Sequence, residues 1–79
     1  MQEVVMPDLG PDIEEAMVSF WHVEEGEHVE QGMDIVEVAS EKSTFNIQAP
    51  CSGVLTERIA REGDTIGVGD VMARIEEDD

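Results

Sequence analysis

The sequence predicts a single all-β domain, a sandwich or barrel of short strands, and three observations support this prediction. The aliphatic residues are mostly β-branched, with ten valines and six isoleucines against two leucines, and such side chains favour pleated strands. Glycine and proline recur at short intervals, as turns between short strands require. No segment shows a sustained 3.6-residue hydrophobic period, so we expect no helix. A chain of 79 residues is long enough for one domain only.

The turn signals divide the chain into eight short segments. Strands are expected at residues 3–6, 18–23, 28–29, 34–39, 44–48, 54–59, 65–66 and 71–75. In the second strand the apolar residues change phase between Val18/Phe20 and Trp21/Val23. A β-bulge at this point would allow Val18, Trp21 and Val23 all to face the core. The acidic residues 76–79 are expected to form a solvated tail or the start of a linker.

An internal repeat relates the two halves of the chain. Residues 26–38 and 63–75 both carry glycine at the first and seventh positions, a β-branched residue at the fourth, and apolar residues at the tenth and thirteenth. The offset is 37 residues (Gly26 to Gly63), and a glutamate, Glu25 or Glu62, precedes the first glycine of each copy. Neither copy can bury its own apolar face. We therefore expect two similar halves, approximately residues 1–41 and 43–79, that pack together with quasi-two-fold symmetry.

The charge is strongly acidic, with 20 Asp and Glu against four Lys and Arg and a formal net charge of −16. This balance argues against nucleic acid as a partner, because binding relies on cations that neutralise phosphates. No apolar run approaches the ~20 residues that span a bilayer, and the N-terminus lacks the pattern of a signal peptide. Cys51 has no partner for an internal disulfide. We expect a folded monomeric domain without membrane contact, in the cytoplasm or, in a eukaryote, the mitochondrial matrix.

Lys42 is the only lysine in the chain. It lies between an apolar run that ends at Val38 and another that begins at Phe45, so the residues from Ser40 to Ser43 are expected at the tip of a hairpin. Two interpretations attach no function to it: a solvated surface lysine, or the last lysine of an acid-rich, halophile-like surface. The third is a modification site, since an exposed amine can be acylated without disturbing the core. Position alone favours the solvated lysine.

Catalytic and metal-binding patterns are weak. His22, His28 and Cys51 lack the spacing of a zinc motif. The serines have no His and Asp partners in a plausible arrangement, and a chain this small cannot enclose a substrate pocket. We therefore expect neither an enzyme nor a metal site.

Several motifs, taken together with their spacing, are typical of a known family of domains. They are Met6-Pro-Asp-Leu-Gly10, Glu15-Ala-Met-Val-Ser-Phe-Trp21, Val23-Glu-Glu-Gly26 with Val29 and Gly32, and Glu41-Lys-Ser43, whose lysine follows Gly26 by sixteen residues and precedes Gly53 by eleven. From Val4 to Ile75 the chain resembles the lipoyl domains of 2-oxo acid dehydrogenase complexes, in the biotinyl/lipoyl-attachment family. The resemblance implies a flattened barrel of two four-stranded antiparallel sheets, a barrel-sandwich hybrid. It also implies lipoate attached to Lys42 as an amide, with Ser40, Glu41 and Ser43 flanking it.

The resemblance further implies a carrier function. The lipoyl arm on Lys42 would accept an acyl group from a thiamine-diphosphate-dependent 2-oxo acid dehydrogenase and deliver it to an acyltransferase site for transfer to coenzyme A. Dihydrolipoamide dehydrogenase would reoxidise the arm, and a lipoate ligase would attach it. The other implied partner is the dihydrolipoamide acyltransferase core. In such domains the segment equivalent to Gly10, Asp12, Ile13 and Glu14 helps the dehydrogenase to recognise its carrier, and we extend that role to these residues as a hypothesis.

Two alternatives remain beside the lipoyl carrier. The first is a biotin carrier domain of a carboxylase, although related biotin domains usually flank their lysine with methionines and this chain has Glu41 and Ser43. The second is an unmodified structural or adaptor module of the same fold. The hairpin departs from the common lipoyl pattern Glu-Thr-Asp-Lys-Ala: Ala39 replaces the first glutamate, and Glu41 replaces the aspartate.

Overall fold

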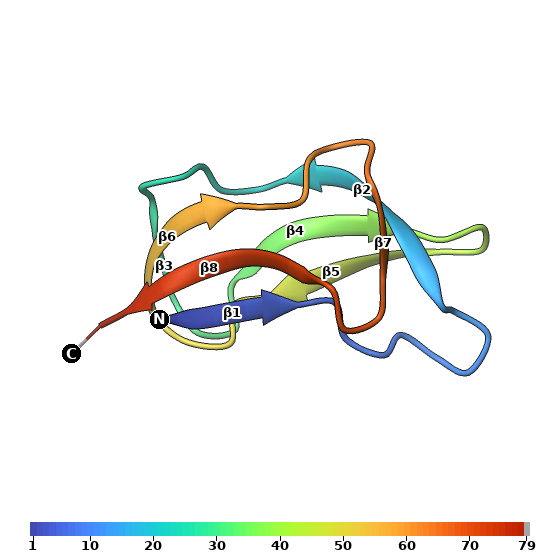
Figure 1. The fold of residues 1–79 in the computed structure, drawn as a ribbon, viewed down its shortest axis with the longest axis horizontal. Helices are drawn as coiled ribbons and strands as arrows, with labels where there is room; N and C mark the ends of the chain where they lie inside the picture. Colours follow the sequence, from blue (N-terminus) through green and yellow to red (C-terminus); the bar gives the residue numbers. More distant parts are fainter. Residues whose placement is uncertain (79) are drawn as a thin grey trace.

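Eight β-strands and no helix make up residues 1–78, the part of the chain that the computed structural model describes (Figure 1). The strands are β1 (Gln2–Val5), β2 (Glu15–Trp21), β3 (His28–Val29), β4 (Asp34–Ala39), β5 (Thr44–Gln48), β6 (Gly53–Arg58), β7 (Thr65–Gly67) and β8 (Val71–Glu77). They form two antiparallel sheets with strand orders β1-β8-β6-β3 and β5-β4-β2-β7. The predicted fold class is confirmed. Within these residues no helix could cross a membrane.

The strand boundaries required several corrections. β3, β4 and β5 have the predicted bounds, but the prediction of residues 18–23 for β2 was wrong at both ends. β2 begins at Glu15 because residues 15–17 pair with β7. β1 and β6 each begin and end one residue earlier than predicted, and β7 ends one residue later. β8 continues two residues further because Glu77 pairs with Gly53, so Glu76 and Glu77 belong to a strand and not to a tail. Asp79 lies outside the described residues.

The predicted bulge in β2 is present. The register of β2 against β4 shifts between Val18 and Phe20. As a result Val18, Trp21 and Val23 are all buried, whereas Phe20 is 53% exposed. β6 carries the same irregularity against β8, between Leu55 and Glu57, at the corresponding position of the second repeat. The bulge is therefore a duplicated feature that directs each strand into the shared core.

The glutamates that precede the repeat glycines satisfy backbone groups just after these bulges. Glu62 Oε2 accepts a hydrogen bond from Trp21 N (3.1 Å), and Glu25 Oε2 accepts one from Arg58 N (2.8 Å). Trp21 and Arg58 occupy the same position in the two repeats, and each is held by the glutamate of the other half. The next residues, His22 and Ile59, donate to Ile35 O and Met72 O of the paired strands. The amides of Trp21 and Arg58 are therefore on the opposite edge, and a carboxylate is a strong acceptor for such an N–H.

The turn glycines repeat the same two-fold relation. Gly26 and Gly63 have φ angles of 90° and 94°, a left-handed conformation that glycine adopts without steric cost. Gly26 N donates to Leu55 O (2.7 Å), and Gly63 N donates to Val18 O (2.8 Å). Each turn is therefore fastened to the bulged strand of the opposite half. Two residues that occupy equivalent positions in the two halves, and are therefore related by this quasi-two-fold symmetry, are called counterparts below.

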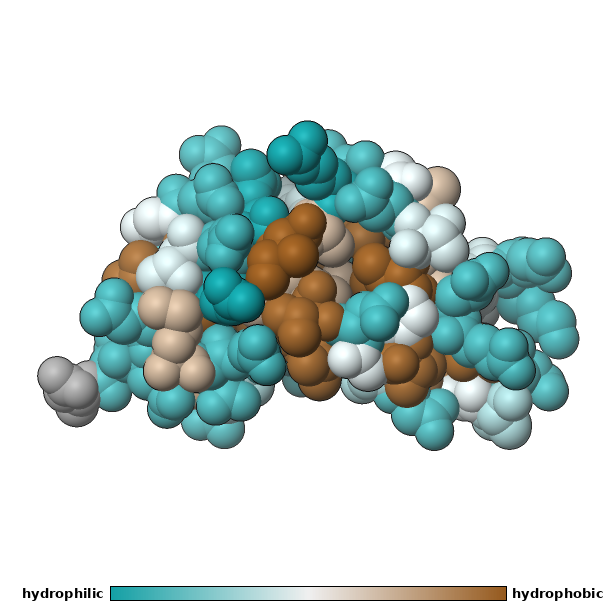
Figure 2. Space-filling model, in the orientation of Figure 1, coloured by the Kyte–Doolittle hydropathy of each residue, from teal (hydrophilic) through white to brown (hydrophobic). Residues whose placement is uncertain are grey.

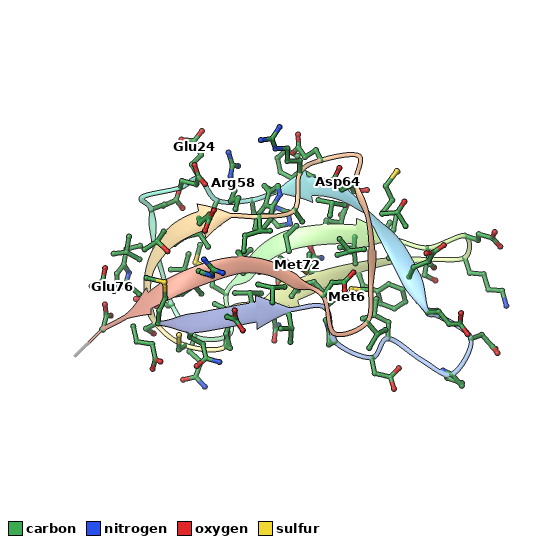
Figure 3. The ribbon with its side chains drawn as sticks, viewed as in Figure 1. Met6, Glu24, Arg58, Asp64, Met72 and Glu76 are labelled. Atoms are coloured by element: carbon green, nitrogen blue, oxygen red, sulfur yellow. The ribbon has the colours of Figure 1, made fainter. Side chains whose placement is uncertain are left out.

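One apolar core lies between the two sheets. Its members are Val4, Met6, Ala16, Val18, Trp21, Val23, Val29, Ile35, Val36, Val38, Ile47, Ala49, Leu55, Ala60, Ile66, Met72, Ala73 and Ile75. Figure 3 shows Met6 and Met72 among the strands, with Glu24 and Glu76 pointing outward. No polar or charged residue is buried among the residues described. The charged side chains of residues 1–78 therefore lie on the surface, where water hydrates them.

Candidate functional site

A tight turn between β4 and β5 carries the single lysine. The strands pair up to Ala39 and Thr44, and Ser40 N then donates to Ser43 O (2.8 Å). No residue other than glycine has a positive φ in the described chain. The turn therefore does not use the left-handed conformations of the common two-residue hairpin types. Its backbone suits ordinary side chains such as those of Glu41 and Lys42.

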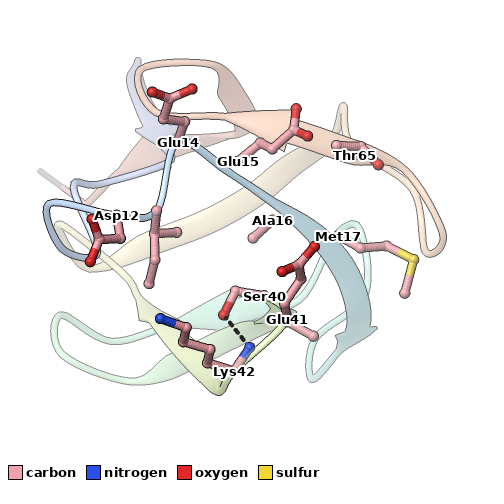
Figure 4. Close-up of a pocket in the computed structure, with 11 residues that line it drawn as sticks. Asp12, Glu14, Glu15, Ala16, Met17, Ser40, Glu41, Lys42 and Thr65 are labelled. Atoms are coloured by element: carbon pink, nitrogen blue, oxygen red, sulfur yellow. Dashed lines mark hydrogen bonds between the residues drawn. The ribbon is translucent and has the colours of Figure 1, made fainter.

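The hydroxyl of Ser40 organises this turn. Ser40 Oγ accepts hydrogen bonds from Lys42 N (3.3 Å) and Ser43 N (3.2 Å), and it donates to Ser43 O (3.2 Å). A serine side chain that binds backbone groups two and three residues ahead is a typical turn-stabilising device. Figure 4 shows the bond from Lys42 to Ser40. The backbone of the lysine is thus held by a side chain, although the turn projects beyond both sheets.

Lys42 is exposed, and among the described residues its side chain forms no ion pair with a carboxylate. Figure 4 shows the side chain extended away from the turn, on the side of the cleft where Asp12 lies. The ammonium group can therefore be reached by another molecule without breaking a contact. This position fits a long group joined to the amine, since an amide there would displace no packed atom.

A shallow cleft of about 420 Å³ lies between the hairpin and the segment that leads into β2. Its lining residues are Asp12, Ile13, Glu14, Glu15, Ala16, Met17, Ala39, Ser40, Glu41, Lys42 and Thr65. The lining therefore combines an apolar floor with four carboxylates and one cation. Because the register of β2 and β4 places Met17 opposite Ala39, the floor is continuous from the loop to the base of the hairpin.

The structure brings together most of the residues that the sequence analysis selected. Ser40, Glu41 and Lys42 line the cleft with Asp12, Ile13 and Glu14. Gly10 and Ser43 do not line it. The φ of Gly10 is 143°, and its carbonyl accepts a hydrogen bond from Ile13 N (3.2 Å). Gly10 thus shapes the turn that presents Ile13.

Five lining residues were not selected from the sequence: Glu15, Ala16, Met17, Ala39 and Thr65. Met17 is 47% exposed although it lies in a strand of apolar residues. Met17 occupies an outward-facing position of the alternating strand pattern, and an apolar residue at such a position is the signal that could have marked it. Its nearness to the hairpin depends on strand pairing, which the sequence does not state.

The other polar residues considered from the sequence have local partners. His22 Nε2 lies 2.9 Å from Asn46 Oδ1, and His28 Nε2 lies 2.9 Å from Asp78 Oδ2. Partial burial, together with the negative charges of Glu77 and Asp78, raises the pKa of the Cys51 thiol. The described residues contain no group of three or more side chains placed to hold a metal ion.

Comparison with known proteins agrees with this geometry. The model of the family described as "Biotin-requiring enzyme", Biotin_lipoyl, matches residues 2–75. The chain belongs to this family of biotinyl- and lipoyl-attachment domains. It is also similar to a solved lipoyl domain, that of the 2-oxoglutarate dehydrogenase complex from Azotobacter vinelandii, with a TM-score of 0.75, 28% identity and 95% of each chain covered. A long-chain acyl-CoA carboxylase shares the fold over 76% of this chain and 6% of its own, with a TM-score of 0.69 and 20% identity.

Two curated relatives are acyltransferase components. The succinyltransferase component of the Bacillus subtilis 2-oxoglutarate dehydrogenase complex is 35% identical over 98% of this chain and 18% of its own length. The acetyltransferase component of the Corynebacterium glutamicum pyruvate dehydrogenase complex is 37% identical over 92% of this chain and 11% of its own. The chain thus corresponds to less than a fifth of these relatives.

Proposed function

We propose that the chain is a lipoyl carrier domain in which lipoate is joined to Lys42 through an amide bond. The observation that carries the proposal is the position of this lysine, which is exposed at a hydrogen-bonded turn and extends beside a cleft. The relatives that are acyltransferase components support it. When bound, lipoate supplies a disulfide that can be reduced and acylated, and so carries acyl groups between active sites.

Each part of the hairpin has a task in this function. Ser40 fixes the backbone of the turn through its hydroxyl, so the attachment point keeps one position while the side chain beyond it stays free. In the attachment step, Lys42 Nζ bonds to the activated carboxyl carbon of lipoate, loses a proton, and the activating group leaves. Glu41 and Ser43 flank the amine, and the carboxylate of Glu41 is a group that an attaching ligase can contact.

The acidic residues around the cleft favour a partner protein with a basic surface. Asp12, Glu14, Glu15 and Glu41 surround the lysine, and converting the amine to an amide removes the only cation of this set. A negatively charged rim steers the domain towards positively charged entrances of active sites. We propose that the thiamine-diphosphate-dependent 2-oxo acid dehydrogenase contacts Asp12, Ile13 and Glu14, on the turn that Gly10 shapes. The acyltransferase core and dihydrolipoamide dehydrogenase are the other proposed partners.

Intact mass measurement tests the attachment. The domain is incubated with a lipoate ligase, lipoate and ATP, and separately with a biotin ligase, biotin and ATP. We expect the gain of one lipoyl group with the first enzyme. Lys42→Arg should abolish the gain, and because Lys42 is the only lysine, the amine left in that variant is the N-terminal one. A gain with biotin alone would establish the carboxylase carrier, and no gain with either ligase would leave an unmodified module.

A pair of serine variants tests the role of the turn. Ser40→Ala removes the hydroxyl that binds Lys42 N, Ser43 N and Ser43 O. Ser43→Ala is the matched control, since the Ser43 hydroxyl forms no hydrogen bond within the described chain. We expect lipoylation of Ser40→Ala to be slower than that of Ser43→Ala. Equal rates would show that the ligase does not depend on the ordered turn.

A further inference from the structure

A row of aliphatic side chains crosses the outer face of the sheet β1-β8-β6-β3. Val5 of β1 pairs with Val71 of β8, and Ile59 N, just after β6, donates to Met72 O on the other side of β8 (2.8 Å). Val5 is 44% exposed, Ile59 is 39% exposed, and Val71 is half-buried. Figure 2 shows apolar side chains gathered over the middle of the molecule on its β1/β8 side, surrounded by hydrophilic ones. We call Val5, Val71 and Ile59 the apolar row.

The other sheet provides an internal comparison for this row. The counterparts of Val5 and Val71 are Gln48 and Asp34, which are also paired, and their side chains are hydrogen-bonded to each other (3.4 Å). The counterpart of Ile59 is His22, whose N–H donates to Ile35 O (2.9 Å) just as Ile59 donates to Met72. The same backbone thus carries three polar side chains in one sheet and three apolar ones in the other.

This difference shows that the fold does not require apolar residues at these positions. Single exposed aliphatic residues are ordinary on protein surfaces. Three that lie side by side, on β1, on β8 and just after β6, where the other half holds polar residues, indicate a surface that contacts another molecule.

The surroundings restrict what that molecule can be. The next row along the sheet is ionic: Arg74 lies 3.9 Å from Glu3 and 3.3 Å from Glu57, so one cation is shared by two acids. A second copy of this chain, also at −16, would be repelled. A stable dimer buries about 800 Å² on each partner, more than three aliphatic side chains can provide. A partner with an apolar contact surrounded by lysines and arginines, bound transiently, fits this surface.

The apolar row is connected to the cleft beside Lys42. Val68 is 45% exposed and lies in the turn between β7 and β8, three residues before Val71. Val68 N donates to Glu14 O (3.1 Å), and Gly69 N donates to Met6 O (2.8 Å). This turn therefore joins the segment that lines the cleft to the end of β1. The counterpart of Val68 is Gln31, again a polar residue.

We infer that Val5, Ile59, Val68 and Val71 form a second docking surface for the 2-oxo acid dehydrogenase that acylates the arm. The inference rests on the proposed function, because it takes the partner to be the enzyme that engages Glu14 and Lys42. Contact through Glu14 and Val68 allows one partner surface to cover both the cleft and the apolar row. Through this surface the dehydrogenase binds the domain by apolar contacts in addition to the acidic residues around Lys42.

The repeat itself supplies the test variants. In the exchange variant, Val5→Gln, Ile59→His and Val71→Asp each introduce the residue found at the counterpart, and the backbone already accommodates these residues in the other sheet. The matched control is Phe20→Glu, which removes an exposed aromatic residue from the other sheet and introduces the residue of its own counterpart, Glu57. Both variants add one carboxylate. Thermal melts by circular dichroism establish that both are folded.

Two measurements distinguish the outcomes. Nuclear magnetic resonance titration of the unlipoylated domain with the dehydrogenase should shift signals of Val5, Ile59, Val68 and Val71 as well as those of the hairpin. With lipoylated domains, kcat/KM for reductive acylation should fall about tenfold in the exchange variant, equivalent to about 1.4 kcal/mol, and stay within about twofold of wild type in Phe20→Glu.

Other results would overturn the inference. Unchanged kcat/KM in the exchange variant, with no shifts in the apolar row, would show that the dehydrogenase does not use it. An equal loss of kcat/KM in Phe20→Glu would show that the added carboxylate, and not the apolar row, causes the effect. Sedimentation as a dimer that the exchange abolishes would assign the row to a second copy. Failure of the proposed function is seen separately, as absence of a lipoyl mass gain, while the titration with unlipoylated domain still reports on docking.

Discussion

The two halves of this domain have the same internal framework and different surfaces. In both halves a bulged strand is held by a glutamate from the other half, and both turns use a glycine with φ near 90°. The charges differ: the residues before Lys42 include twelve acids and no lysine or arginine, whereas those after it include eight acids and three arginines. The bulges, the glutamates that bind beside them and the turn glycines are alike in the two halves, whereas the charge is not.

The hairpin at Lys42 is the clearest divergence. β4 and β5 are joined by the four-residue turn that presents the lysine, whereas the equivalent pair, β8 and β1, lies where the two ends of the chain are found (Figure 1). Quasi-two-fold symmetry therefore places the turn that carries Lys42 at one end of the molecule and the start of β1 and the end of β8 at the other.

The largest expected effect compares Trp21 with its counterpart Arg58. The two side chains make equivalent bonds, Trp21 Nε1 to Ala60 O (3.0 Å) and Arg58 Nη1 to Val23 O (3.2 Å), and the guanidinium carbon lies 5.8 Å from the indole centroid. Trp21 is 6% exposed, so Trp21→Ala should lower the free energy of unfolding by about 3–5 kcal/mol. Arg58→Ala should cost about 1 kcal/mol. Urea unfolding measures both, and similar losses would mean that the guanidinium is as important to the core as the indole.

Gly53 and its counterpart Ala16 provide the next comparison. A Cβ added to Gly53 would lie 2.1 Å from the backbone oxygen of Glu76, and this backbone belongs to the neighbouring strand β8. Gly53→Ala should therefore separate β6 from β8 and lower the free energy of unfolding by about 3 kcal/mol. Ala16→Gly, the reverse change in the other half, should cost about 1 kcal/mol. Denaturant midpoints of the two variants test this order, and a mild Gly53→Ala would show that β8 can move away.

The two bulge glutamates should differ less. Glu62 accepts from Trp21 N in a partly buried contact, whereas the contact between Glu25 and Arg58 N is exposed. We expect Glu62→Ala to cost about 1–2 kcal/mol and Glu25→Ala about 0.5–1 kcal/mol. Hydrogen exchange of the Trp21 and Arg58 amides gives a second measurement, since each amide should lose protection only when its own glutamate is removed. Loss of exchange protection at both amides in one variant would mean that the two bulges open together.

The smallest expected effect concerns the unequal charge. Raising ionic strength from about 0.01 M to about 0.15 M shortens the screening length from about 30 Å to about 8 Å, which relieves repulsion among the acids. The melting temperature should therefore rise, by an amount equivalent to about 1 kcal/mol or less. Thermal melts in sodium chloride measure this. A melting temperature that does not change with salt would show that the arginines already balance the acids near them.

Much of this domain could be predicted from the sequence because the responsible signals are local. β-branched residues between turn glycines predict short strands, and three of the eight have the expected bounds. The change of apolar phase between Val18/Phe20 and Trp21/Val23 predicted a bulge in β2, which the structure places between Val18 and Phe20. The spacing of glycines predicted the repeat. The position of Lys42 at the tip of a hairpin was predicted for the same reason, because a hairpin is defined by residues adjacent in the chain. The boundaries that were wrong, at β2 and β8, depend on how far a neighbouring strand continues to pair.

The sequence by itself determined that the chain is an acidic, duplicated β-domain with one lysine on a tip, since composition, periodicity and turn chemistry are properties of neighbouring residues. Only the tertiary structure decided which residues surround that lysine, because Met17 and Thr65 reach the cleft through strand pairing. The tertiary structure also aligned Val5, Val71 and Ile59, which come from three distant segments, and placed their polar counterparts on the other sheet. Such a surface is determined by the register of the strands, and pairing between distant segments fixes that register.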